Sequence, residues 1–262
     1  MLTQRLISAA IGIPFIIGAI WVGKEALAAL VALAVFVATL EIGAARDSAG
    51  TPWWVLTAVA AAALPIVALG SAEDVLGAAA IVIMLQLTIL TFSPDPKASV
   101  ETWLFGIMSC LYFGVLASHF VLLREMPEGR DLVIFTVVTV WLTDTGAYAV
   151  GRAVGSRKLA PAISPGKTVE GALGSFVTGF VSVFLLDFAL GLDFELKHRI
   201  ILGLVLPIVI LFGDLGESAI KRAVGVKDSS NIVPGHGGVA DRIDSLLFAV
   251  PVVYWYINWV IL

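Results

Sequence analysis

The segment LGLVLPIVILFGDLGESAIKR, residues 202–222, decides the fold class, because an apolar helix runs directly into charged residues. Its first eleven residues carry no charge, which is typical of a membrane-spanning helix. At helical spacing Asp214, Glu217, Ser218 and Lys221 share one face. A charge at the bilayer centre costs about 2.5–3.5 kcal/mol on insertion scales, so this face is expected to meet a partner or a wet cavity.

The composition of the whole chain extends this conclusion to the complete sequence. Of the 262 residues, 59% are hydrophobic and 14% are charged, and the net charge of −4 gives no reason to expect a nucleic-acid partner. A bilayer core of about 30 Å requires roughly 20 apolar residues per helix. We therefore predict an all-α polytopic membrane protein with about nine spans, at residues 7–22, 26–44, 53–70, 76–93, 102–123, 131–151, 170–190, 199–213 and 243–261.

Lysine and arginine predict the orientation of these spans. With the N-terminus in the cytoplasm, eleven of the sixteen basic residues fall on the cytoplasmic side. We expect a cytoplasmic N-terminus, residence in the inner membrane, and two parts of the chain. Residues 1–130 would hold about five spans, and residues 131–262 would form the catalytic region, with cytoplasmic loops at 152–169 and 214–244.

Carboxylates at two helix ends are candidates for binding a cation. Asp241, Asp244 and Ser245 share a face at the start of the last span, as Asp214 and Glu217 do at the end of the preceding one. Asp144 lies about two turns inside its span. Carboxylate oxygens suit Mg²⁺, which also retains water and borrows phosphate oxygens. Salt bridges to nearby lysine and arginine side chains are the alternative, and spacing alone favours neither.

Two glycine-containing stretches are candidates for binding phosphate. In Pro234-Gly235-His236-Gly237-Gly238, successive N–H groups next to a helix start could cradle an anion, although an ordinary turn is the alternative. The segment Ser164–Thr168 ends in Gly-Lys-Thr. It is not a P-loop, because Pro161 stands where that motif has its first glycine, but Lys167 could still bind phosphate.

These residues resemble a known family. SAIKRAVGVKDSSNIVPGHGGVADRID, residues 218–244, is similar to the signature of the phosphatidate cytidylyltransferases, also called CDP-diacylglycerol synthases. WLTDTGAYAVGR and SPGKTVEG resemble further segments, so the likeness covers residues 141–244. It implies a polytopic homodimer that condenses CTP with phosphatidic acid and releases pyrophosphate, using Mg²⁺ and a monovalent cation such as K⁺.

The resemblance also implies roles for individual residues. Asp214 and Asp241, supported by Asp144 and Asp244, would hold metal, in a polar cavity that opens to the cytoplasm. Glycines and a histidine of the signature would approach phosphate, and Lys167 would engage the nucleotide or the lipid head group. The residues expected to clamp phosphate are Lys221, Arg222, Lys227 and Arg242. The remaining signature residues are Ser218, Asp228, His236, Gly237 and Gly238.

Two other functions fit parts of the pattern. A sister enzyme, such as an isoprenoid-lipid cytidylyltransferase or a CTP-dependent polyprenol kinase, would share the nucleotide but not the lipid acceptor. An ion-coupled transporter could use Asp144 and the acidic cluster as a cation path. Against transport, the charges crowd one membrane face instead of the midplane, and a transporter needs no phosphate-binding glycines and lysines.

Overall fold

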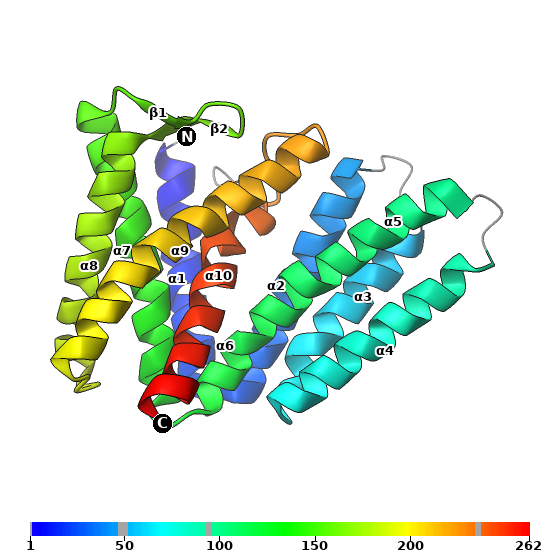
Figure 1. The fold of residues 1–262 in the computed structure, drawn as a ribbon, viewed down its shortest axis with the longest axis horizontal. Helices are drawn as coiled ribbons and strands as arrows, with labels where there is room; N and C mark the ends of the chain where they lie inside the picture. Colours follow the sequence, from blue (N-terminus) through cyan, green and yellow to red (C-terminus); the bar gives the residue numbers. More distant parts are fainter. Residues whose placement is uncertain (1, 47–51, 93–95, 234–236) are drawn as a thin grey trace. The chain divides into compact units, whose positions relative to one another are not determined.

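The computed structural model describes residues 2–262 except 47–51, 93–95 and 234–236. Within these ranges the chain is mostly helical (Figure 1). The helices are α1 (Leu2–Val22), α2 (Lys24–Arg46), α3 (Pro52–Val67), α4 (Ala72–Leu90), α5 (Pro96–Ser109), η1 (Cys110–Val115), α6 (Leu116–Glu125), α7 (Gly129–Val154), α8 (Val169–Leu190), α9 (Leu196–Ala223), α10 (Ala240–Tyr256) and η2 (Ile257–Ile261). The π-helical segments η1 and η2 continue α5 and α10, so each forms one long helix with its neighbours.

Seven helices of the described chain are long and apolar enough to cross a membrane. They confirm a mostly helical polytopic membrane protein. Two shorter apolar helices, Gly12–Val22 and Trp53–Val67, fall on the first and third of the expected spans. Each of the nine expected ranges thus overlaps a helix. That the two shorter apolar helices also cross the membrane stays a prediction.

The chain divides into two compact units. The first contains Met1–Glu125 together with Asp228–Asp241, and the second contains Met126–Lys227 together with Arg242–Leu262. The part of the signature at Asp228–Asp241, called the signature loop below, is therefore grouped with the N-terminal helices. The predicted loop at 214–244 begins too early, because α9 continues to Ala223, and it ends too late, because α10 already starts at Ala240. The apolar run ends near residue 213, but the backbone hydrogen bonds of the helix do not depend on apolar side chains.

In the first unit, α2 packs against α3 and α6. The Trp54 ring lies directly on the backbone of Gly43, where a Cβ atom would lie 2.7 Å from Trp54 Cε3. Fully buried side chains such as Val35, Leu64 and Phe113 fill the space between these helices. This packing fixes the C-terminal end of α2 against α3, and α2 carries one of the residues described below.

In the second unit, α8 packs against both α7 and α9 (Figure 1). Close approach depends on small residues: a Cβ atom on Gly171 would lie 3.0 Å from the Ala147 carbonyl, and one on Gly179 would lie 2.6 Å from Pro207 Cγ. The ridge Gly171, Ser175 and Gly179 is thus a packing surface, as its spacing of four residues indicates.

A two-stranded hairpin joins α7 to α8. Strands β1 (Lys158–Ala160) and β2 (Ser164–Thr168) are antiparallel, with Lys158 opposite Thr168. Glu170, in the first turn of α8, accepts hydrogen bonds from the backbone N–H of Ser156 at 3.0 Å and from its hydroxyl at 2.9 Å. The hairpin is therefore tied to the start of α8, and it carries Lys167.

Candidate active site

Three carboxylates from three helices of the second unit form the centre of the site. Asp144 on α7, Asp214 on α9 and Asp244 on α10 interact electrostatically with one another. Helices α9 and α10 come close because Gly213 has no side chain, and a Cβ atom there would lie 3.0 Å from both the Asp244 carbonyl oxygen and Ser245 Cα. The arrangement brings together negative charges that would repel one another unless a cation lies nearby.

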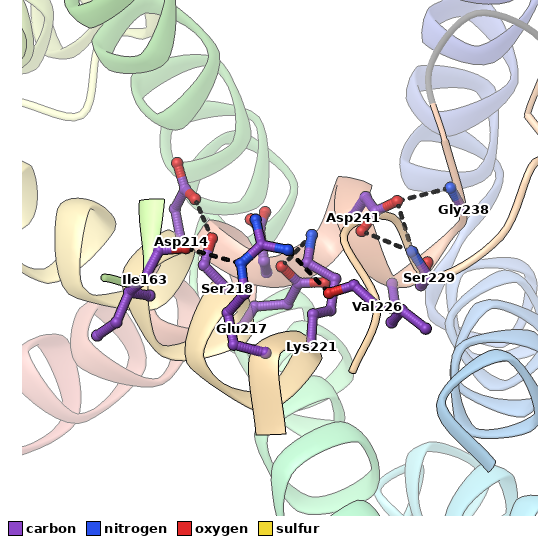
Figure 2. Close-up of polar contacts among 12 residues, drawn as sticks. Ile163, Asp214, Glu217, Ser218, Lys221, Val226, Ser229, Gly238 and Asp241 are labelled. Carbon is purple, nitrogen blue, oxygen red and sulfur yellow. Dashed lines mark hydrogen bonds and ion pairs between the residues drawn. The ribbon is translucent and has the colours of Figure 1, made fainter. Parts of the chain in front are cut away.

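Two basic side chains face these carboxylates. Lys167 Nζ lies 2.6 Å from Asp214 Oδ2, and the two side chains are 20% and 35% exposed. Arg242 interacts electrostatically with Asp144 and Asp244. The Ser218 hydroxyl donates a long hydrogen bond of 3.5 Å to Asp214 Oδ1, as Figure 2 shows. Lysine, arginine and carboxylate side chains together can bind a phosphate and its counter-ion.

One turn further along α9, the charged side chains Glu217, Lys221 and Arg222 pair with one another or with backbone carbonyl groups. Lys221 Nζ lies 2.7 Å from Glu217 Oε2, and both side chains are buried. Arg222 donates to the carbonyl oxygens of Ile163 at 3.1 Å and Val226 at 2.9 Å (Figure 2). Arg222 thus links the hairpin to the segment that follows α9, in addition to the phosphate role implied by the resemblance.

In the first unit, the carboxylate of Asp241 accepts hydrogen bonds from backbone groups of the signature loop to which it belongs. Asp241 accepts hydrogen bonds from the backbone N–H of Ser229 at 3.2 Å and of Gly238 at 2.8 Å (Figure 2). Gly237 has φ +84°, a conformation that glycine adopts without strain, and its carbonyl oxygen accepts from the Val233 N–H at 2.9 Å. These bonds close the loop around the start of α10.

Glu41, on α2, contacts the same loop through its carboxylate. Its two oxygens accept hydrogen bonds from the hydroxyls of Ser229 and Ser230 and from the backbone N–H groups of Val239 and Ala240. The sequence marks Glu41 only as an acid inside an apolar helix, and nothing local identifies partners about 190 residues away.

The residues predicted from the sequence thus fall into two groups. Asp144, Lys167, Asp214, Ser218, Lys221, Arg222, Lys227, Arg242 and Asp244 belong to the second unit, whereas Asp228, Gly237, Gly238 and Asp241 belong to the first. Lys227 and Asp228 are exposed, and His236 lies outside the described residues. Glu41 is an addition, whereas Glu217 was already expected on the face it shares with Lys221, and the structure pairs the two side chains.

The acidic set suits a hard cation in its chemistry. Among the described residues, no three histidine, cysteine or carboxylate side chains lie close enough together to hold a metal ion by themselves. Mg²⁺ does not need such a cage, because it is usually bound by one or two carboxylates together with water and substrate phosphate. The cluster of Asp144, Asp214 and Asp244 fits this way of binding Mg²⁺. In the interactions given above, its three carboxylates interact with two basic side chains, Lys167 and Arg242.

These features describe a class of protein: a helical membrane protein with a mixed carboxylate and basic cluster suited to phosphate and a divalent cation. The sequence matches the Cytidylyltransferase family over residues 3–260, and the chain belongs to that family.

Curated relatives carry a more specific name. The chain is 37% identical over 180 residues to the phosphatidate cytidylyltransferase of Bacillus subtilis (strain 168), covering 67% of this chain and 65% of that protein. It is 45% identical over 151 residues to the phosphatidate cytidylyltransferase of Staphylococcus aureus (strain COL), covering 56% of each. The matched region therefore spans 65% and 56% of these two relatives, less than two thirds of either.

Proposed function

We propose that this protein is a phosphatidate cytidylyltransferase, which converts CTP and phosphatidic acid into CDP-diacylglycerol and pyrophosphate. The observation that carries the proposal is the Asp144, Asp214 and Asp244 cluster with Lys167 and Arg242, in a membrane protein of the Cytidylyltransferase family. Similarity to relatives that bear this name supports the choice of lipid acceptor.

The reaction requires little proton transfer. A phosphate oxygen of the lipid attacks the α-phosphorus of CTP, the new P–O bond forms, and the bond to the bridging oxygen of pyrophosphate breaks. The bonding electrons leave with pyrophosphate. The lipid phosphate is already an oxyanion at neutral pH, so the protein acts through positioning and charge neutralisation. Because the reaction requires no general base, it agrees with a site made of carboxylate, lysine and arginine side chains.

In this proposal Lys167 and Arg242 bind phosphate oxygens directly. Lys167 is paired with Asp214 at 2.6 Å, so an arriving phosphate competes for the ammonium group while a cation competes for the carboxylate. Lys221, Arg222 and Lys227 complete the basic side of the site. The signature loop with Asp228, His236, Gly237, Gly238 and Asp241 is assigned to the same reaction by the resemblance.

Asp214 and Asp144 of the second unit, together with Asp241, are the proposed metal ligands, with Asp244 in support. When bound, Mg²⁺ neutralises charge on the nucleotide phosphates and on the leaving pyrophosphate. We also propose a monovalent cation, such as K⁺, as a second cofactor.

The membrane arrangement forms part of the proposal. Nine crossings with a cytoplasmic N-terminus put the end of α7, the end of α9 and the start of α10 on the cytoplasmic side, together with the hairpin. Asp144, Asp214 and Asp244 lie near those ends, where a polar cavity open to the cytoplasm would admit CTP. We propose an inner-membrane homodimer.

The test is pyrophosphate release by the full chain in detergent, with CTP, phosphatidic acid and Mg²⁺, omitting each in turn. Release that requires all three, with CDP-diacylglycerol identified by mass spectrometry, is the expected result. Release with an isoprenoid-lipid phosphate but not with phosphatidic acid would show that the lipid acceptor is an isoprenoid phosphate instead of phosphatidic acid. Absence of release with any lipid phosphate, or transfer of the γ-phosphate to polyprenol, would overturn the proposal.

A further inference from the structure

We infer that Glu41 is the positioning residue that holds the signature loop and the start of α10 in place. Oε1 accepts from Ser230 Oγ at 2.6 Å and from the Val239 N–H at 3.0 Å. Oε2 accepts from Ser229 Oγ at 3.1 Å and from the Ala240 N–H at 2.9 Å. Both oxygens of one carboxylate therefore bind residues 229–230 on one side of the loop and residues 239–240 on the other.

The chemical character of these bonds requires a carboxylate. Four donors converge on two acceptor oxygens, and two of these donors are backbone N–H groups that cannot become acceptors. Glu41 is only 4% exposed, so water cannot replace a bond that is lost. Its charge also lies at the N-terminus of α10, where the helix dipole favours an anion.

Gly238 is needed for this contact. A Cβ atom on Gly238 would lie 2.6 Å from Glu41 Oε2 and would overlap Ser229 Oγ. Its own N–H donates to Asp241. The second glycine of the pair therefore permits close approach of the loop backbone to Glu41, which explains the residue type without reference to a ligand.

The consequence concerns how phosphate is bound. The predicted anion cradle comprises the Pro234–Gly238 stretch and the helix start that follows it, and residues 234–236 lie outside the described residues. At its helix end, the N–H groups of Gly238, Val239 and Ala240 donate to Asp241 and Glu41. These three N–H groups are therefore not available to nucleotide phosphate while the bonds persist, and Glu41 acts by fixing the backbone from which Asp241 and Arg242 follow. This effect on the reaction rests on the proposed function, whereas the effect on the loop does not.

The first variant is Glu41→Gln, because an amide offers one acceptor oxygen and opposes an N–H donor with another donor. Amide hydrogen exchange of residues 229–240, measured by mass spectrometry in detergent, reports on the loop. We expect exchange of the Val239 and Ala240 amides to become about tenfold faster, with the other helices unchanged. Glu41→Asp, which keeps both oxygens, should restore part of the protection.

Kinetics supply the second measurement. If the loop is ordered in only a fraction of the free variant molecules, the KM for CTP rises by about tenfold while kcat at saturating CTP falls less than about threefold. The KM for the lipid should not change. The matched control is Glu101→Gln, because Glu101 is an exposed carboxylate of the same unit that pairs with Arg46 at 3.8 Å.

The outcomes separate the inference from the proposed function. Unchanged exchange at Val239 and Ala240, or faster exchange throughout the chain, overturns the positioning role, as does a fall in kcat with unchanged KM for CTP. If the wild-type protein shows no lipid-dependent activity, the proposed function fails and the exchange result still decides the role of Glu41. If Glu41→Gln does not fold, Ser229→Ala removes the hydroxyl that donates to Oε2, and the same exchange test applies.

Discussion

Replacement of Asp214 by asparagine tests the centre of the proposed site. At 2.6 Å and an effective dielectric constant of about 20, attraction between Lys167 and Asp214 is about 6 kcal/mol before desolvation and screening. Partly exposed pairs retain only about 1 kcal/mol or less of this in net stability. Loss of the pair is therefore too small to unfold the protein, and a large loss of activity would have another cause.

The expected cause is weaker binding of the cation. Interactions with a charged group contribute about 1.5–3 kcal/mol, which corresponds to about a 10- to 100-fold change in affinity. We expect Asp214→Asn to raise the Mg²⁺ concentration for half-maximal pyrophosphate release by this factor, with little change in melting temperature. Titration of Mg²⁺ at fixed CTP and lipid measures it.

The matched control is Asp193→Asn. Asp193 is an exposed carboxylate of the same unit with φ +51°, a conformation that asparagine also adopts readily. It should leave the Mg²⁺ dependence unchanged. An Asp214→Asn protein with the Mg²⁺ dependence of the wild type would refute the assignment of Asp214 as a ligand.

Three further predictions follow from particular contacts. Lys221→Met leaves the buried Glu217 without its ion-pair partner and should destabilise the protein by about 3–5 kcal/mol, whereas the double variant with Glu217→Leu should recover most of the melting temperature. Gly179→Ala should lower the melting temperature because its Cβ atom would lie 2.6 Å from Pro207, and Gly77→Ala, with open space around it, should not. Removal of Mg²⁺ by EDTA should abolish pyrophosphate release, and added Mg²⁺ should restore it without refolding.

The helices were predictable because each depends on a local property. About 20 apolar residues in a row are sufficient to specify a span, so every predicted range overlaps a helix. The shared face of Asp214, Glu217 and Lys221 was also predictable, since it follows from the helical repeat. The same face implied that the helix continues past residue 213, but the predicted span still ended there, because hydropathy marks where the membrane ends and carries no information about where backbone hydrogen bonds end.

Features that depend on distant partners could not be predicted in this way. The hairpin consists of strands of three and five residues, too short for a strand signal and interrupted by proline and glycine. Its position depends on Glu170, which lies on the following helix. Likewise Lys167 could be recognised as a phosphate candidate, but its pairing with Asp214 depends on the packing of the second unit.

The signature loop shows how a correct pattern can have a different physical basis. Its paired glycines and helix start resemble an anion cradle, and among the described residues the N–H groups of Gly238, Val239 and Ala240 do bind anions, namely the carboxylates of Asp241 and Glu41. The same donors cannot serve a phosphate while these bonds persist. A glycine-rich turn before a helix therefore identifies a need for negative charge, and only the distant partner of the turn decides whether that charge comes from the protein or from its substrate.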